Sequence, residues 1–163
     1  MQRLFTPWRF SYISESVPRD GCFFCDAARD PEDPDRLVVF VGEYHVVMLN
    51  KFPYSNGHLL IAPFAHISDP LDEEPSAAAE LWPLVLKSQR TLKNAYAPQG
   101  FNMGINLGIA GGAGVPGHYH YHVVPRWEGD TNFMTVLGDV RLVPEDARSV
   151  VERLRPLFQE EAV

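Results

Sequence analysis

The stretch GHYHYHVVPRW, residues 117–127, sets three histidines at alternate positions ahead of two valines. Aromatic and β-branched residues in such a short run predict a β-strand. On a strand, side chains two positions apart share one face, so His118, His120 and His122 are expected to line one wall of the sheet. Imidazole titrates at about pH 6.5, so each ring can serve as nucleophile, proton donor or metal ligand. We therefore interpret the stretch as a functional site in preference to an exposed strand with surface histidines.

The size and composition of the chain fit one compact domain. It has 163 residues, of which 45% are hydrophobic and 21% are charged, as in ordinary globular proteins. Its net charge of -7 argues against a broad basic surface for a nucleic acid polymer. The apolar runs are far shorter than the roughly 18 residues of a membrane span, and residues 1–16 lack the apolar stretch of a secretory signal. We therefore expect a cytoplasmic protein with no membrane partner.

Other runs of apolar and β-branched residues predict further strands. Two of them flank Gly42 as a hairpin, and a third and a fourth lie further along the chain. These runs are RLVVF (36–40), HVVMLN (45–50), HLLIAP (58–63) and FNMGINLG (101–108). Residues 128–144 are expected to hold one or two short strands more. Because hairpin-like runs precede a single long helix, an antiparallel sheet is favoured over a doubly wound parallel one.

Helical periodicity predicts one main helix and one short C-terminal helix. The main helix is expected over 76–96, with Ser76 as its cap and with a kink or a late start at Pro83. The short helix is expected over 145–154, ended by Pro156.

The remaining segments complete the predicted organisation. Residues 1–35 are expected to be irregular, because prolines interrupt them. The sequence thus predicts an α+β fold in a single domain, 1–163, with an extended N-terminal arm, 1–35, and a C-terminal appendage, 128–163.

Two further features have chemical meaning. The loop IAGGAGVPG, 109–117, contains Gly112 and Gly114, where backbone N–H groups can approach a phosphate without a side-chain clash. The only cysteines, Cys22 and Cys25, have the C-x-x-C spacing of a metal site or a redox pair. A structural tetrahedral metal needs two more nitrogen or sulfur ligands, and the alternative is a pair of reduced, partly buried thiols.

Two motifs resemble the histidine triad (HIT) family. HYHYHVV, 118–124, resembles the family signature His-φ-His-φ-His-φ-φ, where φ is apolar, and LNKFPYSNGHLLIAP, 49–63, resembles its Asn-x-x-Pro-x-x-x-Gly-His segment. LFTPWR, CFFC and HVVPRWEGDTNF are most similar to a bacterial branch that includes diadenosine tetraphosphate phosphorylases. The resemblance covers residues 20–130 and implies a HIT-like antiparallel sheet.

The resemblance also implies a reaction in two steps through a nucleotidyl-histidine. His120 is then the nucleophile, and a carbonyl near His118 holds its tautomer. His122 and His58 donate to a phosphoryl oxygen. The substrate is a dinucleoside polyphosphate, with an adenine nucleotide favoured and with water or phosphate as the acceptor.

Further roles follow from the same resemblance. Asn50 is expected to contact the ribose and Asn106 the phosphates or the leaving group, although an asparagine at a strand end usually caps a turn. His66 and His118 complete a structural zinc site with the two cysteines. No organic cofactor is implied, and the protein is expected to form a homodimer.

Two alternatives stay open at the level of sequence. The three histidines could be ligands of a metal used in catalysis. The chain could also be a nucleotide-binding regulator with little turnover, because GGAGVPG, 111–117, lacks the serine, threonine or glutamine that many HIT relatives carry before the triad. His45 has no chemical neighbours in the sequence and is expected to be structural.

Overall fold

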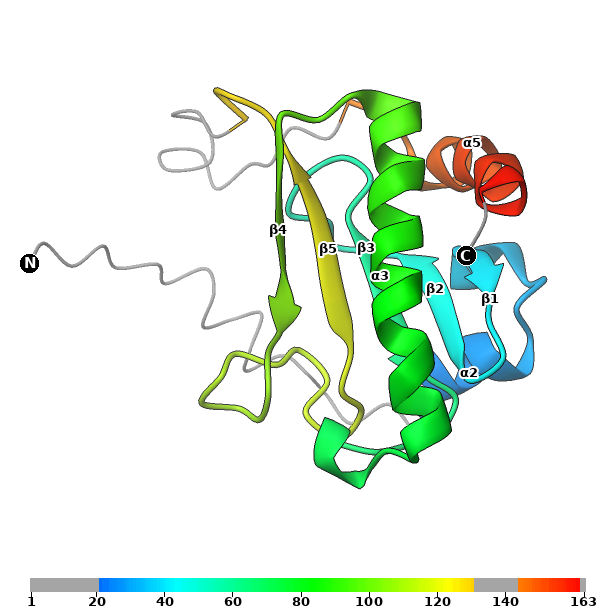
Figure 1. Ribbon diagram of the computed structural model, residues 1–163, viewed down its shortest axis with the longest axis vertical. Coiled ribbons are helices and arrows are strands. Elements are labelled where there is room, and N and C mark those ends of the chain that lie inside the picture. Colours follow the sequence, from blue (N-terminus) through cyan, green and yellow to red (C-terminus); the bar gives the residue numbers. More distant parts are fainter. Residues whose placement is uncertain (1–20, 131–143, 162–163) are drawn as a thin grey trace, which may run out of the picture.

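A five-stranded antiparallel sheet forms the centre of the computed structural model, which describes residues 21–130 and 144–161 (Figure 1). Its strands are β1 (Val38–Val41), β2 (His45–Leu49), β3 (Leu59–Pro63), β4 (Gly100–Ile105) and β5 (Tyr121–Arg126). They lie in the order β1-β2-β3-β5-β4, and each neighbouring pair is antiparallel. The predicted α+β fold with an antiparallel sheet is therefore confirmed. Residues 1–20 and most of the 128–144 segment lie outside the described residues.

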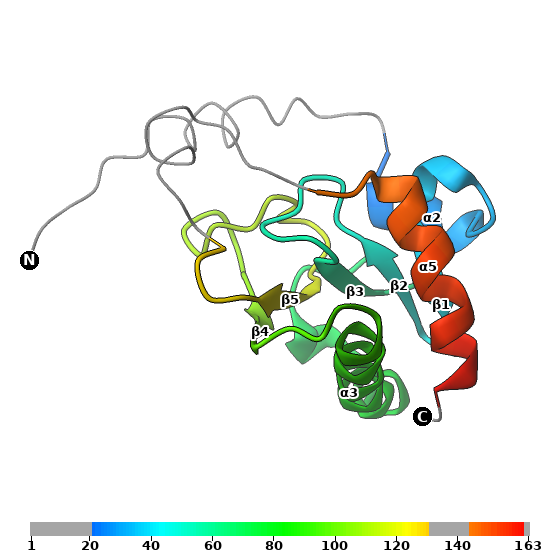
Figure 2. The same cartoon turned by 90° about the horizontal axis from the view of Figure 1, so that it is seen from above.

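The sheet is buried on both faces at its centre, which explains the nearly continuous apolar runs of β2 and β3. One face packs into what we call the principal core, together with helices α3 and α5. The other face packs into the second core, together with helix α2. Seen from above, α3 and α2 lie on opposite sides of the sheet, and α5 lies at its β1 end (Figure 2). The second core consists of Phe24, Ala27, Val38, Val46, Met48, Leu60 and Ala62.

Helix α2 (Phe23–Arg29) was not expected, because residues 1–35 are predicted to be irregular. Pro18 and Pro31 lie on either side of this helix and do not interrupt it. Phe24 and Ala27, three positions apart, share one face and are both buried in the second core. Tertiary packing therefore stabilises a helix that is too short to be stable alone.

Helix α3 (Pro75–Tyr96) confirms the main helix but corrects its start. Its N-cap is Glu74, and Ser76 lies inside the first turn, so the predicted cap at Ser76 is wrong. Proline suits the first helical position because its missing N–H has no partner there in any case. The helix is continuous over Pro83, so the late start is also wrong. The loss of one hydrogen bond at Pro83 is offset because Leu84 and other apolar residues pack against the sheet.

Helix α5 (Ala147–Glu160) begins with a side-chain cap and continues past its proline. Asp146 accepts hydrogen bonds from the amides of Arg148 and Ser149, each at 3.1 Å. The predicted end at Pro156 is wrong, because the residues on either side of it are held by packing. Leu154 and Phe158 are fully buried in the principal core.

Replacing Leu154 with alanine is expected to lower the free energy of unfolding by about 2–5 kcal/mol, because Leu154 is 0% exposed in the principal core. Leu71 is the matched control: it is 90% exposed, so Leu71→Ala is expected to change the free energy by less than about 0.5 kcal/mol. Urea unfolding followed by circular dichroism measures both. Equal effects of the two substitutions would contradict the placement of α5 in the core.

Candidate active site and metal site

The three triad histidines do not form the single strand wall that the sequence predicts. β5 begins at Tyr121, so only His122 belongs to the strand, while His118 and His120 lie just before it. His120 and His122 are 5% and 9% exposed and lie side by side, with ring centroids 4.9 Å apart. His118 is fully buried, and its Nδ1 lies 3.3 Å from the sulfur of Cys22. The triad is thus divided between two sites that share a short piece of backbone.

The proton of His120 is fixed by its nearest backbone group. Nδ1 of His120 lies 3.1 Å from the carbonyl oxygen of His118, which can only accept a hydrogen bond. Nδ1 therefore carries the proton, and Nε2 presents a lone pair. Burial lowers the pKa of His120. The hydrogen bond to the His118 carbonyl raises this pKa and offsets only part of the effect of burial. The ring of His120 is therefore neutral at neutral pH and has the protonation state of a nucleophile.

The proton of His122 is fixed by a chain of hydrogen bonds that begins at a backbone amide. The amide of Tyr54 donates to Nδ1 of His58 at 3.1 Å, and Nδ2 of Asn50 lies 3.2 Å from the same nitrogen. The proton of neutral His58 is therefore on Nε2, which lies 2.9 Å from Nδ1 of His122. Nδ1 of His122 accepts, so its own proton is on Nε2. Within residues 21–130 and 144–161, Nε2 of His122 has no hydrogen-bond partner.

These two tautomers are complementary. His120 offers a lone pair on Nε2, and His122 offers an N–H on Nε2. Burial, together with the positive charge that His120 can carry, lowers the pKa of His122 to about 4. Both rings are thus neutral near pH 7, and the pair can attack an electrophile while donating a hydrogen bond to it.

His58 and Asn50 lie beside this pair, but their polar atoms are directed to the protein. His58 is fully buried and has bonds at both ring nitrogens. In this structure the Nε2–H of His58 is directed to His122, and the expected donation from His58 to a phosphoryl oxygen stays a prediction. Asn50 accepts from the amide of Phe52 at 2.9 Å, as expected of a residue that caps a turn, and keeps its amide nitrogen beside His58.

The glycine-rich loop closes on itself. The amide of Gly112, which has a φ of +83°, donates to the carbonyl of Ile109 at 3.0 Å. The turn thus uses that amide in this structure, and the expected approach of the Gly112 amide to phosphate stays a prediction. Gly111 is required for packing, since a Cβ there would lie 2.2 Å from the carbonyl oxygen of Leu107. Gly114 is exposed, and Asn106 is half-buried directly after β4.

The predicted metal ligands come together. The ligand atoms of Cys22, Cys25, His66 and His118 all lie within 4.8 Å of one another. The sulfur of Cys25 lies 3.3 Å from Nδ1 of His66. Nε2 of His118 lies 2.9 Å from the carbonyl oxygen of Pro63 and donates to it, which leaves Nδ1 free of a proton on the side of the cysteines. Segments far apart in the sequence thus supply one compact set of four donors.

The chemistry of this set fits a metal with four protein ligands. Cys22 is the N-cap of α2 and Cys25 lies in its first turn, so the three-residue spacing places both sulfurs on one side of the helix. The pKa of Cys25 is raised to about 11, mainly by burial and secondly by the hydrogen bond with the Cys22 thiol. A cation beside the sulfur would favour the thiolate form. Two sulfurs and two imidazole nitrogens are donors that suit a tetrahedral site.

The sequence did not reveal two groups of contacts, those of Tyr54 with the histidines and those of His45 with two carboxylates. Tyr54 lies over His122, with centroids 5.9 Å apart and planes at 13°, and its amide sets the tautomer of His58. His45 is fully buried between two carboxylates, 3.0 Å from Glu73 and 2.9 Å from Glu80. A backbone amide has no sequence signal, and the partners of His45 are brought to it only by the tertiary fold.

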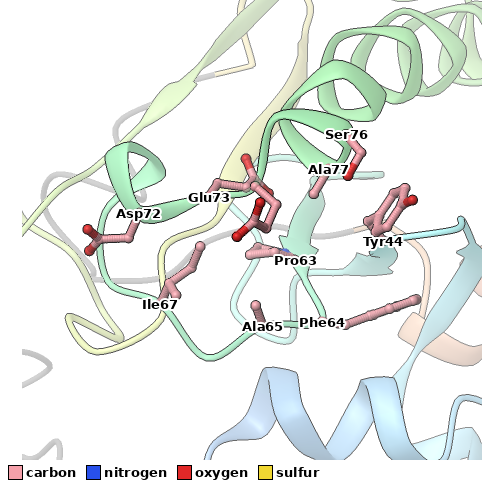
Figure 3. Close-up of a pocket in the computed structure, with 10 residues that line it drawn as sticks. Tyr44, Pro63, Phe64, Ala65, Ile67, Asp72, Glu73, Ser76 and Ala77 are labelled. Carbon is pink, nitrogen blue, oxygen red and sulfur yellow. The ribbon is translucent and has the colours of Figure 1, made fainter.

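A cavity of about 300 Å³ lies near the start of α3, walled by Tyr44, Phe64, Asp72 and Glu73 among others (Figure 3). It lies on the α3 side of the sheet. His120 lies on the other side, where its ring centroid is 4.7 Å from that of Phe24 in α2. The three triad histidines are not among the residues that line the cavity, although its wall includes Pro63, whose carbonyl accepts from His118.

Comparison with known proteins agrees with this geometry. The HIT domain family matches residues 31–129. The chain is 39% identical to an AP-4-A phosphorylase of Mycobacterium tuberculosis over 152 residues, which cover 89% of this chain and 78% of the relative. It is 32% identical to an asymmetrical bis(5'-nucleosyl)-tetraphosphatase of Schizosaccharomyces pombe over 50% of this chain and 44% of that protein. A crystal structure of a zinc-bound histidine triad family protein from Mycobacterium smegmatis superposes with a TM-score of 0.69, at 26% identity, over 86% of this chain and 95% of that one.

His122 is expected to stay neutral in the folded protein until the pH falls to about 4, because burial disfavours its charged form. The unfolded chain takes up this proton at about pH 6.5. Between these two values the unfolded state binds more protons, so the free energy of unfolding decreases as the pH falls through this window. NMR titration of the ring carbon-bound protons measures the pKa, with the urea-unfolded protein as reference. A folded-state pKa equal to the unfolded one would contradict the buried, neutral pair.

Proposed function

The chain belongs to the HIT domain family and is an enzyme of that family, and from this premise we propose that it cleaves dinucleoside polyphosphates such as diadenosine tetraphosphate through a nucleotidyl-histidine. The supporting observation is the complementary tautomers of His120 and His122. One ring presents a lone pair and the adjacent ring an N–H, as attack on phosphorus and stabilisation of the charge that develops there require.

In the first step, Nε2 of His120 attacks the α-phosphorus of the substrate. A nitrogen–phosphorus bond forms, and the bond from phosphorus to the bridging oxygen breaks. The departing nucleoside polyphosphate takes that electron pair. The proton on Nδ1 stays in place, and its hydrogen bond to the carbonyl of His118 stabilises the positive charge of the ring. Nε2–H of His122 donates to a non-bridging phosphoryl oxygen.

In the second step, an acceptor oxygen attacks the same phosphorus and His120 leaves with its lone pair restored. Water as acceptor converts diadenosine tetraphosphate to AMP and ATP, and phosphate as acceptor converts it to ADP and ATP. We propose phosphate, because the relative that is 39% identical over most of this chain is a phosphorylase. The tetraphosphatase relative matches a shorter part.

The remaining binding roles are proposals on the same basis. Asn50 is proposed to direct the second N–H of its amide nitrogen to the ribose, since one N–H faces His58. Asn106 and Gly114 are proposed to lie near the phosphates. The substrate is proposed to carry adenine. Because the loop before His118 has no hydroxyl or amide side chain, backbone groups or water would assist the leaving group.

Catalysis by a metal on the three histidines is disfavoured by the geometry. Nδ1 of His118 points to the cysteines, while Nδ1 of His122 accepts from His58. The rings are therefore already committed to different partners. A nucleotide-binding regulator with little turnover is the second candidate, supported by the same missing side chain before the triad.

We propose that the metal at Cys22, Cys25, His66 and His118 is zinc with a structural role. The donor set and the zinc-bound histidine triad protein of Mycobacterium smegmatis both support this assignment. When bound, zinc with four protein ligands supplies a cross-link and has no open position for substrate. It would join the start of α2 to the segments that contain His66 and His118.

The protein is also proposed to form a homodimer. β4 is an edge strand of the sheet, and large exposed apolar side chains lie on it and directly after it, at Met103, Leu107 and Ile109. Such residues at a sheet edge are candidates for burial by a second chain.

Over residues 21–130 and 144–161, no helix combines the length and the apolar character needed to cross a membrane. The cytoplasmic location stays a prediction.

Brief mixing with diadenosine tetraphosphate, followed by an alkaline quench, is expected to add the mass of one adenylyl group to the peptide that contains His120. Phosphoramidates survive alkali, so mass spectrometry can locate the group. His120→Asn is expected to form no adduct and to lose at least about 10³-fold in turnover, because asparagine supplies no nucleophilic nitrogen.

In a second sample, which is not quenched, the adduct is chased with and without inorganic phosphate. We expect ADP to form when phosphate is added. If AMP is the only product even with phosphate present, the reaction is hydrolysis and the proposed phosphorolysis is wrong. If the parent protein binds AMP as tightly as His120→Asn does, yet forms no adduct and no product, the proposed cleavage through a nucleotidyl-histidine fails and the nucleotide-binding regulator remains.

The purified protein is expected to contain about one zinc per chain, and Cys25→Ser is expected to lose it, because a neutral hydroxyl is a poor ligand for zinc. Elemental analysis by mass spectrometry measures the ratio. Asp26→Asn is the control, since Asp26 is adjacent in the sequence but is not among the four donors. Retention of zinc by Cys25→Ser would contradict the proposed ligand set.

A further inference from the structure

The carbonyl that holds the His120 proton lies outside the sheet. The ladder of β5 begins at Tyr121, which pairs with Ile61 on β3 and with Ile105 on β4. His118 and His120 precede this first pair, so the ladder hydrogen bonds do not fix their backbone. A shift of the His118 carbonyl would break the hydrogen bond that sets the tautomer of His120. Other contacts must therefore hold this piece of chain.

Tyr119, between the two histidines, supplies such contacts. Its side chain is buried, with 1% exposed. Its hydroxyl donates to Oε2 of Glu73 at 2.7 Å, and its amide donates to the carbonyl of Ile67 at 2.8 Å. The residue is thus fixed both at its backbone and at the far end of its ring. Rotation of the chain at residues 118–120 would require the hydroxyl to leave a buried carboxylate.

The carboxylate of Glu73 is itself held by a network of buried groups. Its other oxygen lies 3.0 Å from Nε2 of His45, a contact of the two buried side chains without hydrogen-bond geometry. Nδ1 of His45 lies 2.9 Å from Glu80. Glu80 in α3 also accepts the amides of Glu43 and Tyr44. The bond to Glu73 and the packing of Glu73 against His45 thus place Tyr119 beside the start of α3 and the β1–β2 hairpin.

Such a network is costly to bury. The side chains of His45 and Glu73 are 0% and 2% exposed, so both are almost wholly removed from water. Apolar residues of similar volume are often as stable as a buried ion pair, or more so. Stability alone therefore does not require these residue types. Glu73 also borders the cavity of Figure 3, on the side of the sheet away from His120.

We propose that Tyr119 is a positioning residue, held at its hydroxyl by the buried Glu73 that packs against His45, which keeps the His118 carbonyl on Nδ1 of His120. The role acts through the backbone of residues 118–120, because Tyr119 and His120 point to opposite sides of the chain. It rests on the proposed function, in which Nε2 of His120 is the nucleophile. Loss of the Tyr119 hydroxyl would let the other tautomer of His120 form, with its proton on Nε2 and no lone pair there.

The test is Tyr119→Phe, which removes one oxygen and keeps the ring. We expect nucleotidyl-His120 to form about tenfold more slowly or worse, with an unchanged dissociation constant for AMP. In histidine-labelled protein, ¹⁵N chemical shifts are expected to change from a single tautomer of His120 to a mixture. Tyr121→Phe is the matched control, because Tyr121 is a half-buried tyrosine two residues further along, at the start of β5. It is expected to match the parent in all three measurements.

Glu73 gives a second, independent comparison. Glu73→Gln keeps an oxygen that can accept from the Tyr119 hydroxyl, while Glu73→Ala removes it. We expect the glutamine variant to keep most of the parent rate and tautomer and the alanine variant to resemble Tyr119→Phe. This pair decides the question if Tyr119→Phe does not fold.

Parental rate and a single tautomer in Tyr119→Phe, or equal behaviour of Glu73→Gln and Glu73→Ala, would overturn the positioning role. If the parent protein forms no adduct, the proposed function fails on its own. The ¹⁵N spectra still decide whether Tyr119 and Glu73 hold the tautomer of His120, since they require no turnover.

Discussion

The hydrogen bond from Nδ1 of His120 to the carbonyl of His118 is the contact on which the proposed chemistry depends. It places the proton on the inner nitrogen and leaves Nε2 with a lone pair. A parallel chain from the amide of Tyr54 through His58 gives His122 the opposite arrangement. Each chain ends at a backbone group, a carbonyl for one ring and an amide for the other. The fold thus determines which ring can attack and which can donate, and no charged side chain is needed.

His118 connects this chemistry to the metal site. Its carbonyl accepts from His120, its Nε2 donates to Pro63, and its Nδ1 lies among the cysteines. A metal at this site would therefore hold the ring of the residue whose backbone orients the nucleophile. From the other side of the sheet, Tyr119 holds the same piece of chain. The segment before β5 lacks support from the sheet ladder but is held on both faces by side chains.

The elements and the chemical identity of the site could be predicted from the sequence, because apolar periodicity and motif spacing are local properties. The five described strands, the main helix, and the grouping of Cys22 and Cys25 with two distant histidines all agree with expectation. Helix α2 and the continuation of α5 past Pro156 could not be predicted, since burial of Phe24 and Phe158 stabilises them. The role of His58, the closed turn at Gly112 and the carboxylates around His45 depend on atoms that only the tertiary fold brings together.

The position of the bond in the nucleotidyl-histidine tests the central claim most directly. If the His118 carbonyl holds the proton on Nδ1, phosphorus can bond only to Nε2 of His120. ³¹P NMR of the alkali-quenched, digested adduct distinguishes the two linkage isomers, with synthetic standards of each for reference. We expect the Nε2 isomer alone. An Nδ1 isomer, or an adduct on any other histidine, would contradict the account.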